Sequence, residues 1–137
     1  MKLVLDTNIL VSALLTKGTP PDQLYRAWES GDFDLFTSTR QISELKRVLS
    51  YKKLQPYIKP MEAALLLENI DSMAYRIPVP TARTESPDPD DNWILATAIN
   101  AGADFLVTGD KHHLLDLERI ESVRTVAART MLGHLQH

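Results

Sequence analysis

The chain has 137 residues, of which 44% are hydrophobic and 24% are charged, with a formal net charge of −3. This size and composition predict one globular domain over residues 1–137 and exclude a disordered chain. Because the sequence has no cysteine, disulfides and thiolate metal sites are excluded, which fits a reducing compartment. No signal-peptide core precedes Asp6, and no apolar stretch is long enough for a membrane span, so we expect a cytoplasmic protein without a membrane anchor.

The predicted elements alternate between strands and helices along the chain. Short apolar runs predict strands over 3–5, 33–37, 104–108 and 123–126, and an edge strand over 76–79, where a proline cannot donate to a ladder. Helical spacing and end signals predict helices over 9–15, 22–30, 61–72 and 91–101, one after Ser38, a short one ending near Leu117 and a last one from Thr130. This alternation predicts an α/β fold, a three-layer α/β/α sandwich around a central, mainly parallel sheet.

Two of these helices carry further signals. Ser38, followed three residues later by Gln41, resembles a capping box, and Glu44 lies beside the apolar stripe of the helix that follows. The helix over 91–101 is apolar on nearly every face and ends at Gly102, so we expect it to be buried between other elements.

Acidic residues lie at the ends of predicted strands or early in predicted helices: Asp6, Glu44, Asp91 and Asp110. The carboxyl ends of parallel strands border the crevice where α/β proteins bind ligands, so these carboxylates can share one pocket. Carboxylates that share a pocket repel one another unless a cation neutralises them, and oxygen-only ligands favour Mg²⁺ or Mn²⁺. Asn8 and Thr108 lie two residues from Asp6 and Asp110 and could hold a carboxylate or a water in place.

A site of this kind can hydrolyse phosphodiesters without a protein nucleophile. One metal ion activates a water, and a second ion roughly 4 Å away can stabilise the leaving oxygen. The sequence has no cysteine, no G-x-S-x-G motif, no P-loop and no dinucleotide fingerprint. A phosphoryl hydrolase with an aspartyl nucleophile is a weaker alternative, because position 8 is Asn8 and not a second acid. Each acid taken singly could instead cap a helix or lie on a solvated face.

Four motifs in order resemble those of the PIN domain family. They are Leu-Asp-Thr-Asn at 5–8, Ser-x-x-x-x-x-Glu-Leu at 38–45, Asp-Pro-Asp-Asp-Asn-x-Ile-Leu-Ala-x-Ala at 88–98 and Ala-Asp-x-Leu-Val-Thr-Gly-Asp at 103–110. The resemblance spans nearly the whole chain and implies a metal-dependent endoribonuclease, typically the toxin of a type II toxin–antitoxin pair. It further implies a homodimer and a cognate antitoxin that blocks the site. The alternative is a PIN-like module that keeps the acids but only binds RNA or protein.

The resemblance also implies roles for individual residues. By matching position, Asn8 and Thr108 would support a set of acids that bind the metal and act in catalysis: Asp6, Glu44, Asp91 and Asp110. Within the third motif we choose Asp91, because it opens the predicted helix and directly precedes the Asn-Trp-Ile-Leu-Ala run. Asp88 is the alternative, and Asp90 could also bind the metal.

The region from 40 to 59 has six basic residues and one acid, Glu44, in a chain that is acidic overall. We expect part of this region to contact RNA phosphates, through Arg40, Lys46, Arg47, Lys52 and Lys53. The alternative is a solvated helix face. His112 and His113 are expected to be surface residues.

Large apolar side chains raise two further expectations. Trp28 and Trp93 lie on apolar stripes, and we expect both in the core and not as platforms for nucleic-acid bases. The helix over 61–72 has more apolar residues than one face needs: Leu65, Leu66, Leu67 and Ile70. Part of that surface could bury against a second subunit or an antitoxin helix, or the helix could be covered internally.

Overall fold

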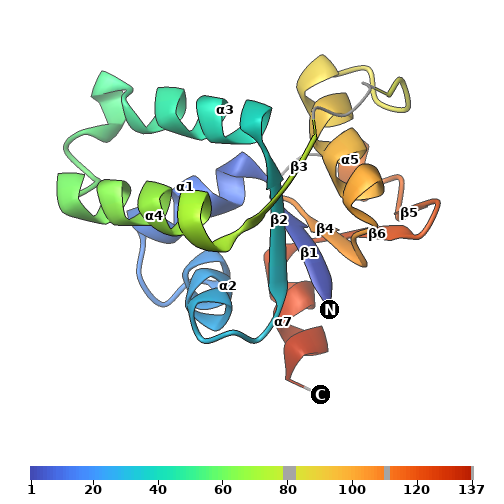
Figure 1. Cartoon of the computed structure of the whole chain (residues 1–137), viewed down its shortest axis with the longest axis horizontal. Helices are drawn as coiled ribbons and strands as arrows, with labels where there is room; N and C mark the ends of the chain where they lie inside the picture. Colours follow the sequence, from blue (N-terminus) through green and yellow to red (C-terminus); the bar gives the residue numbers. More distant parts are fainter. Residues whose placement is uncertain (79–82, 110–111, 137) are drawn as a thin grey trace.

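The structure, a computed structural model, describes residues 1–78, 83–109 and 112–136 (Figure 1). In this part of the chain, six strands form one sheet in the order β3-β2-β1-β4-β6-β5. The strands are β1 (Lys2–Leu5), β2 (Asp34–Ser38), β3 (Tyr75–Ile77), β4 (Phe105–Val107), β5 (Arg119–Ile120) and β6 (Val123–Val126). Every pairing is parallel except that of β5 with β6 at one edge, so the prediction of a mainly parallel sheet is confirmed.

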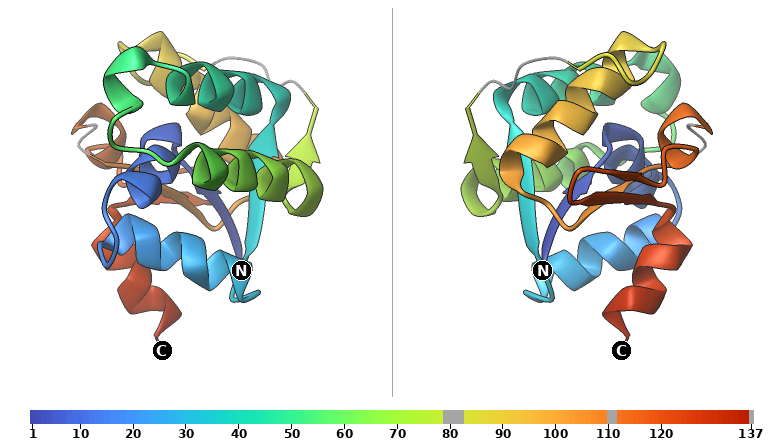
Figure 2. Two further views of the ribbon diagram at one scale, coloured as in Figure 1. Left: turned by 90° about the vertical axis from the view of Figure 1, so that its left-hand side faces the viewer. Right: turned by 90° about the vertical axis from the view of Figure 1, so that its right-hand side faces the viewer.

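Helices cover both faces of the sheet (Figures 1 and 2). One face carries α1 (Thr7–Leu15), α2 (Pro20–Glu29), α3 (Thr39–Leu49), α4 (Pro60–Met73) and α7 (Ala128–Leu135). The other face carries α5 (Pro89–Ala101) and the short α6 (His112–Leu115). A 3₁₀ turn, η1 (Lys52–Leu54), follows α3. The three-layer α/β/α sandwich predicted from the sequence is therefore present. None of the described helices is long and apolar enough to cross a membrane.

Strand β1 lies at the centre and divides the core into two clusters. Leu3 and Leu5 pack with the helices of the first face, whereas Val4 packs with α5 on the second face. This follows from the alternation of side chains along a strand, and an apolar residue at every position suits a strand covered on both sides. Each fully buried leucine in these clusters stabilises the fold by about 1.5–3 kcal/mol. The central position of β1 places Asp6, the next residue, in the middle of the sheet's carboxyl edge.

The start of α3 confirms one half of the predicted capping box. The Ser38 Oγ accepts a hydrogen bond from the Gln41 backbone N–H at 3.2 Å, as an N-cap should. The Gln41 side chain does not return to Ser38, because its Nε2 donates to the carbonyl of Leu5 at 2.6 Å. The second half of the capping box is replaced by a link between α3 and β1.

Helix α5 begins earlier than the sequence pattern indicated. It starts at Pro89, and the Asp88 carboxylate caps it by accepting a hydrogen bond from the Asp90 N–H at 2.9 Å. The prediction placed the start at Asp91 because the apolar pattern begins there, but a proline in the first turn and an Asp before it are stronger start signals. The end at Gly102, in the left-handed conformation with φ 65°, is as predicted.

Two strands also differ from the prediction. β3 begins at Tyr75 and ends at Ile77, and Val79, the predicted last residue, lies outside the described residues. β5 was not predicted, because it has two residues and forms only as a tight hairpin with β6. Glu118 and Glu121 flank it with φ values of 56° and 53°, a left-handed conformation that apolar periodicity does not reveal.

Candidate functional site

The predicted site residues come from the carboxyl edge of the sheet. In Figure 1 the N-terminus lies at the lower end of the sheet, and α3 and α5 flank the upper end, where β1 and β2 finish. Asp6 follows β1, and Thr108 follows β4, its neighbour in the sheet. Helix α5 returns from this edge to the start of β4, so Asp91 in its first turn also lies on the carboxyl side.

Asp6 is held by a residue far away in sequence. Its side chain is buried, and its Oδ2 accepts a hydrogen bond from the Thr108 Oγ1 at 2.9 Å, across 102 positions. Its backbone N–H donates to the carbonyl of Val107 at 2.8 Å, which extends the pairing of β1 with β4. Asp6 occupies the N-cap position of α1 but makes no side-chain cap hydrogen bond. Asp6 therefore begins the helix through its backbone carbonyl, while its carboxylate is oriented by Thr108, the residue that follows β4.

A buried polar link joins α3 to the end of β1. Gln41 donates to the carbonyl of Leu5, the residue before Asp6, and its Oε1 accepts from the Thr37 Oγ1 at 2.7 Å. A buried amide with satisfied hydrogen bonds fixes the helix against the strand, because leaving either group unpaired would cost roughly 1–3 kcal/mol. Sequence reasoning missed this role for Gln41. The capping motif singled out Gln41, but it predicted that the Gln41 side chain would bond back to Ser38 and not to Leu5.

Asp91 is held by neighbours close in sequence. It is 1% exposed, and its Oδ2 accepts a hydrogen bond from the Ser86 Oγ at 3.2 Å. The next residue, Asn92, accepts from the Ser86 N–H at 2.9 Å and donates to the Ser86 carbonyl at 2.7 Å. The loop before α5 is thus clamped to the first turn of the helix. Neither Ser86 nor Asn92 was predicted, because nothing in the sequence marks a polar loop residue as buried.

The structure distinguishes Asp91 from the other two acids of its motif. Asp88 is exposed, and its carboxylate caps α5. Asp90 is also exposed and lines a groove between α3 and α5. Of the three, only Asp91 is buried.

Glu44 lies on α3, on the side that faces α5. Its side chain is half-buried, and an oxygen lies 4.0 Å from the Arg47 Nη2 one turn later. It lines an open groove of about 280 Å³ together with Arg40, Ser43, Arg47 and Asp90. An exposed ion pair of this length adds little stability, roughly 0–1 kcal/mol.

The donor set fits a hard divalent cation in its chemistry. Asp6 and Asp91 are buried carboxylates on one edge of the sheet, and buried carboxylates are costly unless they are paired, hydrogen-bonded or bound to a metal. Among the described residues, no three acids or histidines come close enough to form a metal cluster. Asp110, the remaining predicted ligand, lies outside the described residues.

Other predicted residues lie around this edge. Asn8 is exposed in the first turn of α1 and lines a groove of about 520 Å³ together with Thr108, Gly109 and residues of α2 and α7. His113 is exposed, as predicted, and the His112 side chain lies outside the described part of the structure.

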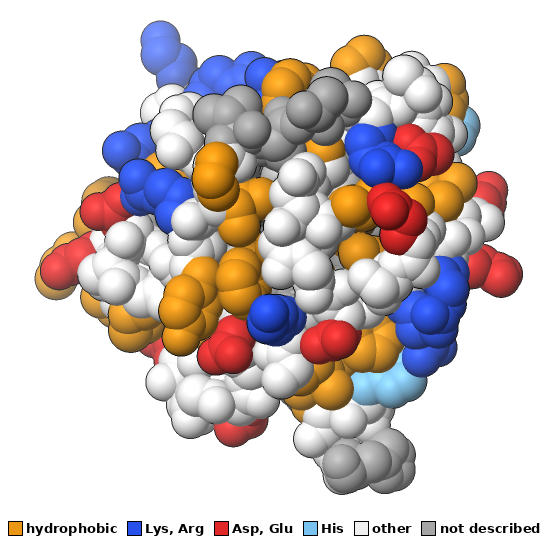
Figure 3. All heavy atoms as spheres, turned by 45° about the vertical axis from the view of Figure 1, so that its right-hand side comes forward, with side chains coloured by type: hydrophobic (Ala, Val, Ile, Leu, Met, Phe, Trp, Pro, Cys, Tyr) orange, Lys and Arg blue, Asp and Glu red, His pale blue; other side chains and the backbone are white. Residues whose placement is uncertain are grey.

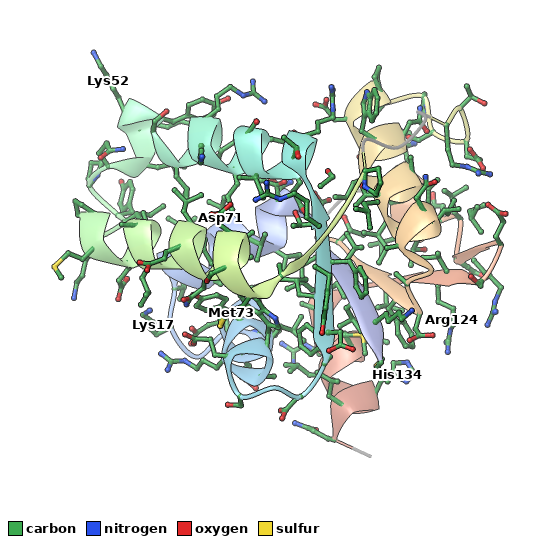
Figure 4. All side chains as sticks on the ribbon, in the orientation of Figure 1. Lys17, Lys52, Asp71, Met73, Arg124 and His134 are labelled. Carbon is green, nitrogen blue, oxygen red and sulfur yellow. The ribbon has the colours of Figure 1, made fainter. Side chains whose placement is uncertain are left out.

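The predicted RNA-binding residues divide into two groups along α3 and η1. Arg40, Lys46 and Arg47 are exposed on α3, whereas Lys52 and Lys53 are exposed on η1 beyond its end. Figure 4 shows Lys52 projecting away from the molecule at the end of α3 that is remote from α5. Figure 3 shows basic side chains gathered toward the α3 side of the view and mixed charges over the rest of that face.

The two tryptophans have different environments. Trp28 is buried in the larger core cluster, as predicted. Trp93 is only half-buried, so its assignment to the core is wrong. Its indole ring faces α3, where the Arg40 guanidinium lies over it with 4.3 Å between the Cζ and the ring centroid. The apolar side chains of α5 cover more of the helix than the sheet does. The sequence pattern shows that Trp93 is among these apolar residues, but not that it lies outside the part of the helix that is buried.

The chain resembles known proteins in both sequence and fold. A family model described as "PIN domain" matches residues 2–112. Among solved structures, the chain is similar to VapBC2 from Rickettsia felis, a crystal structure bound to a promoter DNA fragment, with a TM-score of 0.62 and 23% identity over 93% of this chain and 98% of that one. It is also similar to PAE2754 from Pyrobaculum aerophilum, with a TM-score of 0.63 and 15% identity over 99% and 90% of the two chains. These identities show a shared fold alone. No curated protein matches the sequence significantly.

Proposed function

The chain belongs to the PIN domain family, and from this premise we propose that it is a metal-dependent endoribonuclease that hydrolyses RNA phosphodiester bonds. PIN domains are generally nucleases and generally use divalent metals. One observation carries the proposal: the Asp6 carboxylate, buried at the end of the central strand, is oriented by Thr108 and does not cap its own helix. Such an arrangement holds a charge at a fixed place in the crevice where α/β proteins bind ligands.

In this proposal Mg²⁺ or Mn²⁺ would be held by Asp6, Glu44, Asp91 and Asp110, with Asn8 and Thr108 in support. When bound, the ion supplies a water of lowered pKa as the nucleophile. The protein's own contribution is to fix the ligands. Thr108 orients Asp6, Ser86 orients Asp91, and Gln41 joins the helix that carries Glu44 to the end of β1. Partners that orient metal ligands in this way are usually worth 10- to 100-fold in metal affinity or activity, as a rough guide.

The exposed basic residues of α3 would hold the RNA backbone beside this site. Arg40, Lys46 and Arg47 lie on the helix that carries Glu44, and Lys52 and Lys53 would extend the track. Phosphate contacts release counterions, so each contact adds roughly 0.7 to the salt slope of single-strand binding.

We also propose that the protein acts in the cytoplasm as the toxin of a toxin–antitoxin pair, with an antitoxin partner and as a homodimer. The family resemblance and the name of the similar VapBC2 structure support this. On α4, Leu66 and Ile70 are buried internally, whereas Met61 and Leu65 are exposed. Of the predicted apolar surface, Leu65 is exposed and Leu67 is half-buried, so Leu65, with Met61 added to it, is what remains for a second subunit or an antitoxin.

The test is cleavage of a panel of single-stranded and hairpin RNAs by the purified chain, with Mg²⁺, with Mn²⁺ and with a chelator. We expect cleavage with either metal and none with the chelator. The rival function is a module that binds RNA or protein without cutting. RNA binding without cleavage under every metal condition would support that rival and contradict the nuclease.

A further inference from the structure

Helices α3 and α5 meet at a stacked pair of side chains. The Arg40 guanidinium of α3 lies over the Trp93 ring of α5, with 4.3 Å between the Cζ and the ring centroid. Arg40 is exposed, and Trp93 is half-buried beneath it. Stacking of this kind holds a guanidinium flat and is worth roughly 0.5–2 kcal/mol in related settings. Arg40 is therefore preorganised on one side and accessible on the other.

The accessible side of Arg40 borders the groove that also contains Glu44. This groove, of about 280 Å³, is lined by Arg40, Ser43, Glu44, Arg47 and Asp90. A second, narrower space of about 20 Å³ between the same two helices shares Arg40, Glu44 and Asp90 with this groove and is also lined by Trp93 and Thr97. The narrower space holds about one water, so a ligand of the size of a nucleobase must bind in the larger groove.

The groove has a mixed chemical character that suits a nucleobase better than a phosphate. The carboxylates of Glu44 and Asp90 balance the guanidinium groups of Arg40 and Arg47, so the groove has no net positive charge to attract a phosphate. A carboxylate is an acceptor only, so it favours a ligand that carries a hydrogen-bond donor. A flat guanidinium plane is a surface on which unstacked RNA bases stack. A carboxylate at its edge selects bases that carry an amino group, as cytosine, adenine and guanine do.

We infer that Arg40 and Trp93 form a base-stacking platform that binds one unpaired, amino-bearing RNA base on the open face of Arg40. Asp90 accepts a hydrogen bond from the amino group of that base. This inference rests on the proposed function, because it takes RNA as the substrate. Arg40 then contacts a base in place of the phosphate expected from the sequence. A preference for particular RNA bases would therefore arise beside Glu44.

The test measures binding without cleavage, so that it does not depend on the nuclease proposal. Short single-stranded RNAs, each with one abasic nucleotide at a different position, are titrated in chelator by fluorescence anisotropy. Arg40→Lys keeps the charge but loses the flat stacking surface. We expect it to weaken binding of intact RNA about tenfold, in line with the measured worth of base stacking on protein side chains. We expect no further loss with the RNA that lacks the stacked base.

Arg124→Lys is the matched control. The Arg124 guanidinium lies over the Phe105 ring, with 5.3 Å between the Cζ and the centroid, so the same stacking chemistry is present. Its position pairs with the start of β4, away from the carboxyl edge, and Figure 4 shows it on the side of the molecule opposite Lys52. We expect unchanged RNA affinity. Both arginines are exposed, so neither variant should impair folding.

A second arm tests the amino group. Uracil in place of the stacked base should weaken binding to the wild-type protein, and Asp90→Asn should reduce that difference. The inference is overturned if Arg40→Lys binds every RNA like the wild type, if it loses the same affinity with and without the base, or if the wild type binds no RNA. The inference is supported if Arg40→Lys weakens the binding of intact RNA and not of the RNA that lacks the stacked base. This holds even if the wild-type protein cleaves no RNA with any metal, because that second result contradicts only the nuclease proposal.

Discussion

The two buried aspartates at the carboxyl edge are held in opposite ways. Asp6 is oriented by Thr108, which lies 102 positions away in sequence and directly after the neighbouring strand, β4. Asp91 is oriented by Ser86, which lies five positions away in the loop that leads into its own helix. The position of Asp6 therefore depends on the assembly of the sheet, whereas that of Asp91 depends on a local clamp. This difference predicts which substitutions disturb the fold and which disturb only the site.

Removal of the charges themselves should have the largest effect, and the same effect at both aspartates. Asp6→Asn and Asp91→Asn keep size and shape but remove a proposed metal ligand, so Mg²⁺-dependent RNA cleavage should fall by at least about 100-fold, beyond the usual cost of a supporting residue. Without metal, both variants should be as stable as the wild type or more stable, because carboxylate repulsion is relieved. Single-turnover cleavage and urea unfolding measure the two quantities.

Asp88→Asn is the control for this pair. Asparagine caps helices about as well as aspartate, so the start of α5 should be kept and cleavage should stay near the wild-type rate. Wild-type cleavage by both Asp6→Asn and Asp91→Asn would show that the catalytic assignment is wrong. A large loss in Asp88→Asn alone would transfer the role to Asp88.

Thr108→Val should disturb both the site and the fold. The substitution keeps the branched shape but leaves the buried Asp6 carboxylate without its cross-strand hydrogen bond, at a cost of about 1–3 kcal/mol in the free energy of unfolding. Cleavage should fall about 10- to 100-fold. Thr125→Val is a matched control, since that buried hydroxyl has no hydrogen-bond partner among the described residues. Its stability should be unchanged or higher, and equal losses in the two variants would contradict the role of Thr108.

Ser86→Ala should disturb the site more than the fold. Asp91 loses its hydroxyl partner, but Asn92 still holds the loop through both of its hydrogen bonds to the backbone of residue 86. We expect cleavage to fall about tenfold and the free energy of unfolding to change by less than about 1 kcal/mol. A stability loss as large as that of Thr108→Val would remove the distinction between a local and a long-range clamp. Ser50→Ala, at an exposed hydroxyl, serves as the control.

Asp22, a third buried aspartate, provides a structural reference for the other two. Burial acts to raise the pKa of Asp22, but the Gly18 N–H at 2.8 Å and the Arg26 guanidinium at 3.2 Å outweigh it, and the net pKa is lowered. A lowered folded-state pKa gives stability that is present above the unfolded value of about 3.9 and is lost as pH falls through the folded value.

Asp22→Asn should therefore be less stable than the wild type at pH 7, by about 1–2 kcal/mol, and the difference should shrink as the pH falls below about 4. RNA cleavage at pH 7 should be unchanged, because Asp22 lines a groove with residues of α2 and α4 that contains none of the proposed ligands. Thermal unfolding from pH 7 to pH 3 measures the effect. A gap between the two proteins that stays constant with pH would contradict the pKa assignment.

Much of the fold could be predicted because its signals are local. Alternating apolar runs and helical stripes gave the order of strands and helices, Ser38 gave the start of α3, and Gly102 gave the end of α5. Each of these signals lies within a few residues of the feature it determines, and backbone conformation responds to near neighbours. The acids at the strand ends could be found for the same reason, since a strand end is a local feature.

The partners of those acids were decided by the tertiary structure. Thr108 reaches Asp6 only because β4 lies beside β1, and Gln41 reaches Leu5 only because α3 packs over the end of that strand. Trp93 is apolar in the sequence pattern, but its place beyond the sheet gives it Arg40 as a neighbour in place of the core. Strand order and helix packing join residues that are far apart in sequence, and no local spacing encodes which of them meet.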